Sequence, residues 1–219
     1  MIRIRVFFIL FALAGSLCAA ADGAGPLGAS AEIEWQPYVG EAIDGSPVPG
    51  VLGRILVPEG RRPGAEVGAT VEIAFVRFPT THPDPGPPVF FLAGGPGGSG
   101  VEGAAIVGAH PQVRLLEGRD VIGVDQRGTG LSRPDLTVDV AEDHALPTDR
   151  AVGDAEMKAA VRRAAEATRR HWRAQGVDPA AYNTEESAAD LDAVRRALGL
   201  GEIALWGTSY GSHLGLAYL

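Results

Sequence analysis

The chain has 219 residues, enough for one domain with a buried core. Hydrophobic residues make up 46% of it and charged residues 21%, a balance that excludes an intrinsically disordered protein. The formal net charge is −8, and an acidic surface repels phosphate backbones, so we expect no nucleic-acid partner.

The first residues have the pattern of a secretory signal peptide. Arg3 and Arg5 form a basic start, residues 6–14 are apolar, and three alanines follow at 19–21. The apolar run is too short to cross about 30 Å of hydrocarbon. We therefore expect a cleaved signal over residues 1–21, a secreted or periplasmic protein, and no membrane span after cleavage.

Cys18 is the one cysteine of the sequence and lies within this signal. The mature chain then has no thiol, which excludes disulfides, cysteine-ligated metals and a thiol nucleophile. We expect no metal and no cofactor.

Residues 22–52 are expected to form a leader and an N-terminal extension, rich in glycine and alanine at first and extended from Glu32 onward. Two strands joined by a loop are predicted over residues 53–58 and 70–76. The second alternates apolar and less apolar residues, as a half-buried antiparallel strand does.

Three later apolar runs lack this alternation and suit strands that are covered on both faces. They are residues 88–93, 121–124 and 203–206. Helical periodicity predicts a helix over about 154–173, with Met157 and Val161 on its apolar face. A second helix begins at Asn183 or Thr184 and stops at Gly199, and Asn183 and Glu186 are spaced as a capping box. This order predicts an α/β fold with a mostly parallel sheet and antiparallel N-terminal strands.

The last predicted strand runs directly into Gly207-Thr208-Ser209-Tyr210-Gly211. In a strand–turn–helix context this G-x-S-x-G pattern indicates a nucleophile elbow. A Cβ at Gly207 or Gly211 would collide with a neighbouring strand or helix, and the tight turn exposes the Ser209 hydroxyl. An incidental serine in a glycine-rich turn is the alternative, but the context favours Ser209 as a nucleophile.

A serine that attacks a carbonyl needs donors for the oxygen that becomes negative. The backbone N–H of Tyr210, at the start of the elbow helix, is one candidate. We expect the second from Gly94-Gly95-Pro96-Gly97-Gly98, which follows an earlier strand and has bare amides. A phosphate loop would need a lysine that is absent here, and Pro96 disfavours a dinucleotide loop. An oxyanion loop is therefore favoured.

Another strand ends at Asp125-Gln126-Arg127-Gly128. Charged residues at the carboxyl edge of a sheet can be catalytic. We favour instead an internal pair between Asp125 and Arg127 that braces neighbouring loops.

Four stretches together resemble the α/β-hydrolases of the proline iminopeptidase and tripeptidyl aminopeptidase group. They are the glycine loop at 94–98, the turn at 125–128, Tyr182-Asn183-Thr184 leading into Ala189-Asp190-Leu191-Asp192, and the elbow at 207–211. The elbow alone is shared with esterases and lipases, whereas the proline in the glycine loop and the Asp-Gln-Arg-Gly turn are more specific.

The resemblance covers residues 53–219 and implies removal of one or a few residues from peptide N-termini. Ser209 is then the nucleophile, and the amides of Gly95 and Tyr210 are the oxyanion donors. The neighbouring glycines and Pro96 support the loop and the elbow. The chain departs from the group at Ala93, where a histidine usually precedes the glycines.

A complete catalytic triad is not evident. In this fold the serine is followed by an acidic residue and then by a histidine. Only ten residues follow Ser209; none is acidic, and the one histidine, His213, lies one turn along the elbow helix. The four earlier histidines are expected in loops or on helix surfaces: His82, His110, His144 and His171. We therefore expect residues 53–219 to be the N-terminal part of a hydrolase domain whose C-terminal part is missing, and the chain alone to be inactive.

Three functions stay open at this point. The first is a secreted exopeptidase that acts on peptide N-termini, which the Asp-Gln-Arg-Gly turn favours. The second is an esterase or lipase with the same nucleophile, acting on small esters or amides. The third is a binding protein that keeps the fold without catalysis.

Overall fold

The structure is a computed structural model that describes residues 32–108, 118–137, 146–147 and 149–219. The expected signal peptide and the start of the leader lie outside the described residues, as do His110 and His144. Of the helices in the described part of the chain, none has both the length and the apolar character to span a membrane.

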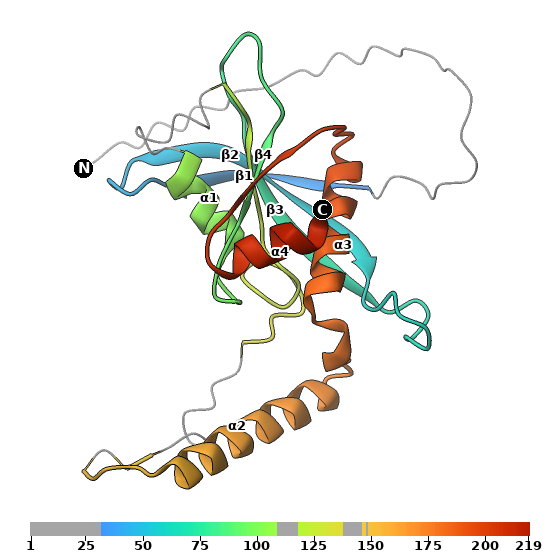
Figure 1. Cartoon of the computed structure of the whole chain (residues 1–219). Helices are drawn as coiled ribbons and strands as arrows, with labels where there is room; N and C mark the ends of the chain where they lie inside the picture. The colour runs from blue at the N-terminus through green and yellow to red at the C-terminus, as the bar shows by residue number, and fades with distance from the viewer. Residues whose placement is uncertain (1–31, 109–117, 138–145, 148) are drawn as a thin grey trace, which may run out of the picture.

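A sheet forms the centre of the molecule (Figure 1). It has six strands in the order β1-β2-β3-β5-β4-β6. The strands are β1 Glu34–Glu41, β2 Pro47–Pro58, β3 Thr70–Phe78, β4 Val89–Leu92, β5 Val121–Val124 and β6 Ala204–Gly207. The pairs β1–β2, β2–β3 and β3–β5 are antiparallel, whereas β4 is parallel to both β5 and β6. The sheet is therefore mixed, with its antiparallel strands first and its parallel strands in the later core, which confirms the expected fold class.

Strand β1 and the first part of β2 lie in the stretch that was expected to be an extension. Most of β1 is exposed, so it lacks the apolar alternation that marks a strand. Glycines in this hairpin make room for aromatic rings of β3: a Cβ at Gly53 would lie 2.4 Å from the Phe75 ring, and one at Gly50 would lie 2.7 Å from the Phe78 ring. The sequence alone does not show why these positions are glycine, because the rings that they accommodate belong to another strand.

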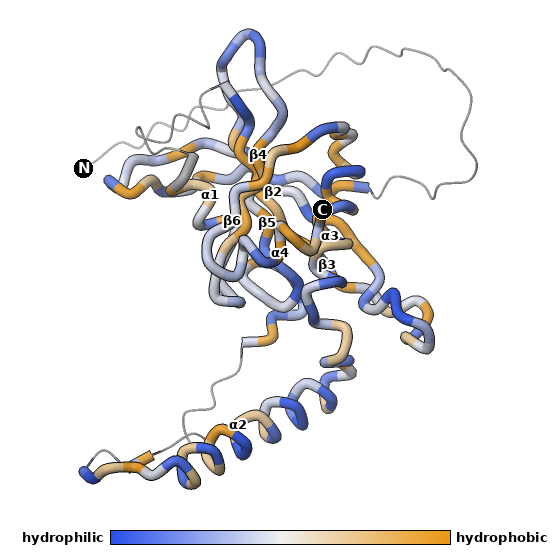
Figure 2. Tube along the Cα trace, viewed as in Figure 1, coloured by the Kyte–Doolittle hydropathy of each residue, from blue (hydrophilic) through white to orange (hydrophobic). Residues whose placement is uncertain are grey.

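Four helices and a short 3₁₀ turn complete the described fold. They are α1 Gly100–Gly108, α2 Asp154–Ala174, η2 Pro179–Ala181, α3 Thr184–Ala197 and α4 Tyr210–Tyr218. Helix α2 has the expected bounds but lies apart from the sheet, and its surface is largely hydrophilic (Figures 1 and 2). Two residues of its predicted apolar face are about half exposed, Met157 at 43% and Val161 at 48%, whereas Ala160 and Ala164 are buried.

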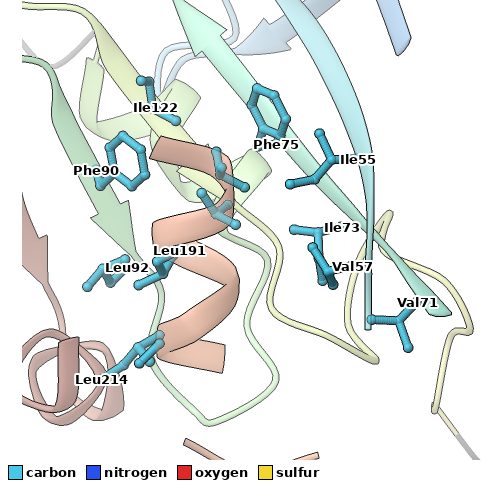
Figure 3. Packing of buried hydrophobic residues seen from close by; sticks show 13 residues of the cluster. Ile55, Val57, Val71, Ile73, Phe75, Phe90, Leu92, Ile122, Leu191 and Leu214 are labelled. Atoms are coloured by element: carbon cyan, nitrogen blue, oxygen red, sulfur yellow. The ribbon is translucent and has the colours of Figure 1, made fainter. Parts of the chain in front are cut away.

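The core has two halves, one on each face of the sheet. Neighbouring residues of a strand alternate between them: Phe90 packs on the side of α3 and α4, and Phe91 on the side of α1. Figure 3 shows the first half, where Leu191 of α3 and Leu214 of α4 meet side chains from β2, β3, β4 and β5. Because both of their faces are covered, β4 and β5 read as unbroken apolar runs, whereas β6, the last strand in the order, is partly exposed.

Arg127 does not pair with Asp125, so the expected internal pair is wrong. Its guanidinium instead forms a bidentate ion pair with Asp190 of α3, with Nε–Oδ2 and Nη2–Oδ1 distances of 2.7 and 2.8 Å. Arg127 also donates to the backbone carbonyls of Glu59 and Ala181. Asp190 lies 63 residues after Arg127 in the sequence, and its two carboxylate oxygens accept from two N–H groups of the planar guanidinium. The neighbouring Asp125 carboxylate is occupied by other donors.

Arg61, in the β2–β3 loop, binds the same helix. It contacts the Glu186 carboxylate through Nη1 at 2.7 Å and through its backbone N–H at 2.6 Å, and it reaches Asp190 at 2.7 Å. The Glu186 side chain thus serves the ion cluster instead of closing a capping box, although the Asn183 side chain accepts from the Glu186 N–H as expected. We call Arg61, Arg127, Glu186 and Asp190 the α3 ion cluster.

Burial opposes ionisation of Glu186, but the hydrogen bonds from Arg61 and the nearby Arg127 charge outweigh it, and the pKa of Glu186 is lowered. A lowered folded-state pKa means that Glu186 stabilises the fold fully above its unfolded pKa. This contribution is lost as the pH falls through the folded pKa.

We predict that Asp190→Ala lowers the free energy of unfolding by about 3–5 kcal/mol, because it leaves the buried Arg127 charge without its partner. Asp192→Ala is the matched control on the same helix. It removes a partly exposed pair with Arg195 and Arg196, and we expect a loss below about 1 kcal/mol. Urea denaturation measures both, and equal losses would contradict the role given to the α3 ion cluster.

Candidate active site

Strand β6 turns into helix α4 through a strained residue. Ser209 has φ 51° and ψ −121°, and it is the one non-glycine residue with a positive φ in the described part of the chain. Its side chain is exposed. A serine in this region is disfavoured by about 1–3 kcal/mol and persists only where its surroundings hold it, which is typical of functional sites.

The glycines around Ser209 permit contacts that no other residue would allow. A Cβ at Gly211 would lie 2.0 Å from the Leu92 carbonyl oxygen, and one at Gly207 would lie 2.5 Å from the Gly211 backbone. A Cβ at Gly94 would lie 2.9 Å from the Ser209 Cβ. The elbow, the end of β4 and the glycine loop therefore meet at backbone contact.

The glycine loop follows β4 and turns back on itself. Gly95 and Gly97 have φ values of 113° and 108°, which side chains rarely adopt, and the Gly98 N–H donates to the Gly94 carbonyl at 3.0 Å. Pro96 lies between them and has no N–H. Gly94, the neighbour of Gly95, lies against Ser209, and the role of the Gly95 amide as an oxyanion donor stays a prediction.

Asp125 fixes the far end of this loop. Its carboxylate is fully buried and accepts from the Ser99 hydroxyl at 2.9 Å, from the Val101 N–H at 3.0 Å and from the Leu131 N–H at 2.7 Å. Asp125 therefore links the loop and the start of α1 to the turn after β5. It braces neighbouring loops as expected, but through these donors and not through Arg127.

A pocket of about 270 Å³ borders the elbow and the glycine loop. It is lined by Pro96, Gly97, Gln126, Arg127, Thr129, Tyr182, Asn183, Thr184, Ser187 and Tyr210. Burial and the Glu59 charge raise the pKa of the Tyr182 phenol in this pocket. A larger hollow of about 710 Å³ lies between α3 and α4, and none of the predicted site residues lines it.

The described histidines do not reach the nucleophile. His82 contacts the Asp84 backbone, and His171 of α2 contacts Gln175, the residue that follows this helix. His213 is exposed on α4, with its ring 5.9 Å from that of Tyr210. Within the described ranges no hydrogen bond joins a histidine to Ser209, and no cluster of three or more metal-ligating side chains occurs there.

Sequence reasoning missed Thr184 as a neighbour of the site. Its hydroxyl lies 2.8 Å from the Tyr210 hydroxyl and lines the same pocket. The Tyr-Asn-Thr stretch at 182–184 contributed to the family resemblance. It did not predict the contact of Thr184 with Tyr210, because the two residues are 26 positions apart in the sequence.

Comparison with known proteins identifies the class. The alpha/beta hydrolase fold family model matches residues 87–219, more than half of the chain, and the chain therefore belongs to the α/β-hydrolase family. It is 31% identical over 203 residues to serine protease Hip1 of Mycobacterium tuberculosis (strain ATCC 25618 / H37Rv), across 84% of this chain and 38% of that protein.

It is also 33% identical over 134 residues to the tripeptidyl aminopeptidase of Streptomyces coelicolor, across 59% of this chain and 25% of that protein. These relatives confirm the resemblance to the α/β-hydrolases of the proline iminopeptidase and tripeptidyl aminopeptidase group. The chain spans less than two fifths of the length of either. The solved structure of Aspergillus niger epoxide hydrolase aligns with 75% of this chain and 30% of that one at 16% identity, but its TM-score of 0.35 is too low to support an argument.

We predict that Gly211→Ala destabilises the protein by about 3 kcal/mol, because the new Cβ would displace the backbone at the end of β4. Gly201→Ala is the control: a Cβ there meets nothing within 4 Å, and we expect a change within about 0.5 kcal/mol. Thermal or chemical denaturation distinguishes them. Similar stabilities for the two variants would show that the elbow does not need a glycine at 211.

Proposed function

We propose that this protein is a serine hydrolase of the peptidase type in which Ser209 attacks the scissile carbonyl. The observation that carries the proposal is the strained, exposed Ser209 between two glycines at a strand–helix turn. The names of the relatives, a serine protease and a tripeptidyl aminopeptidase, support peptides as the substrate class.

The amides of Gly95 and Tyr210 are proposed to receive the oxyanion. Tyr210 is the first residue of α4, where the N–H groups have no intrahelical acceptor and the helix dipole favours negative charge. Gly95 lies in the loop that touches Ser209 through Gly94. Each such donor typically contributes about 10²–10³ in kcat.

The acid and the base of the triad are proposed to come from residues outside the described ranges. A serine hydroxyl keeps its proton at neutral pH without a base and is a weak nucleophile. No described histidine bonds Ser209, and the sequence-based expectation that the triad acid and base follow Leu219 stays a prediction. Secretion through the signal at residues 1–21 belongs to the same proposal.

A fluorophosphonate probe tests the nucleophile. We expect the full-length protein to be labelled stoichiometrically and Ser209→Ala to lose all labelling, because the probe reacts only with an activated serine. Ser46→Ala, which changes an exposed serine paired with Asp44, is the control and should label like the wild type. Equal labelling of the wild type and Ser209→Ala would assign the nucleophile to another residue.

The exopeptidase mode has a separate test. If the substrate's free amine is recognised, N-acetylated peptides should be cleaved at least about a hundredfold more slowly than the same peptides with a free N-terminus. Chromatographic assay of both series with the full-length protein measures the ratio. A ratio near one would refute the aminopeptidase mode, and turnover of aryl esters without peptide cleavage would indicate the esterase alternative.

A further inference from the structure

The side chain of Tyr210 is held by a helix that takes no direct part in the elbow. The Tyr210 hydroxyl lies 2.8 Å from the Thr184 Oγ1, and Thr184 is the first residue of α3. Both side chains line the pocket of about 270 Å³ beside the glycine loop. The residue whose amide is the proposed oxyanion donor is therefore tethered through its phenol.

The start of α3 is a fixed point. The Asn183 side chain caps the helix by accepting from the Glu186 N–H at 2.9 Å. One turn further on, Glu186 binds Arg61 of the β2–β3 loop, and Asp190 binds the buried Arg127 after β5. The helix that begins with Thr184 is thus bound to the β2–β3 loop and to the turn after β5, and this fixes the position of Thr184 beside Tyr210.

The elbow is the part that needs an anchor. Ser209 has a positive φ, and relaxation of this strain would rotate the peptide between Ser209 and Tyr210, which carries the Tyr210 N–H. Two backbone hydrogen bonds close the turn, Gly211 N–H to Thr208 O at 2.8 Å and Ser212 N–H to Ser209 O at 3.0 Å. The phenol of Tyr210 adds a side-chain restraint directly after the strained residue.

We propose that the hydroxyl pair of Thr184 and Tyr210 positions the Tyr210 amide in the oxyanion hole. Thr184 is then a positioning residue that acts through Tyr210 and does not itself touch the substrate. This inference rests on the proposed function, in which that amide receives the oxyanion. An oxyanion donor must be preorganised to stabilise charge that forms only in the transition state, so loosening it lowers kcat more than it raises KM.

Tyr210→Phe and Thr184→Val each remove one hydroxyl and keep the shape of the side chain. With the full-length protein we expect each to lower kcat about tenfold, part of the effect of losing a whole donor, with KM within about twofold. The double variant should be no slower than either single one, because each change breaks the same contact. Thr184→Ser should restore the rate.

Tyr218→Phe is the matched control, since it removes a phenol from the far end of the same helix. Amide hydrogen exchange gives a second readout that needs no activity. Loss of the tether should speed exchange at Gly211 and Ser212 about five- to tenfold in both variants, and Tyr218→Phe should leave it unchanged.

Unchanged exchange at Gly211 and Ser212 would overturn the positioning role, whatever the activity. So would a fall in kcat that Tyr218→Phe reproduces or that only follows a lowered melting temperature. Failure of the proposed function looks different: Ser209→Ala would then keep the wild-type labelling and turnover, while the exchange result still decides whether the tether holds the elbow.

Discussion

The elbow crosses the carboxyl end of β4 at a distance that only glycine permits. The Leu92 carbonyl accepts from the Thr208 N–H at 3.1 Å, and the same oxygen lies 2.0 Å from where a Cβ of Gly211 would be. Thr208 and Gly211, on either side of Ser209, are therefore both held against β4. Ser209 between them keeps its strained backbone conformation. Because the glycine loop begins two residues after Leu92, the same strand end also delivers Gly94 against the serine.

A second constraint reaches the site from the side. The buried charges of the α3 ion cluster are favourable only when all of their donors are satisfied, and Arg127 meets this condition with one carboxylate and several backbone carbonyls. The position of helix α3 relative to the turn after β5 is consequently fixed. Arg127, Thr184 and Tyr210 all line the pocket beside the elbow, so the shape of this pocket depends on the position of α3.

The sequence predicted those parts of the molecule that depend on local chemistry. The elbow at 207–211, the unbroken apolar strands and the Asn183 cap all follow from neighbours within a few residues. Strand β1 was not predicted, because most of its residues are exposed and it lacks the apolar alternation that marks a strand. The predicted partner of Arg127 was wrong because the nearest carboxylate in sequence, Asp125, accepts from backbone amides. The observed partner, Asp190, lies on a helix that is distant in sequence.

The long span of the α3 ion cluster has a consequence for synthesis on the ribosome. Arg61 precedes Glu186 by 125 residues, so at about 5–20 residues per second its partner is made roughly 6–25 s later. The β2–β3 hairpin has time to form in that interval, with its arginine still in water. Throughout this interval the Arg61 guanidinium has no carboxylate partner on α3, so the α3 ion cluster can form only after the chain has been made as far as Asp190.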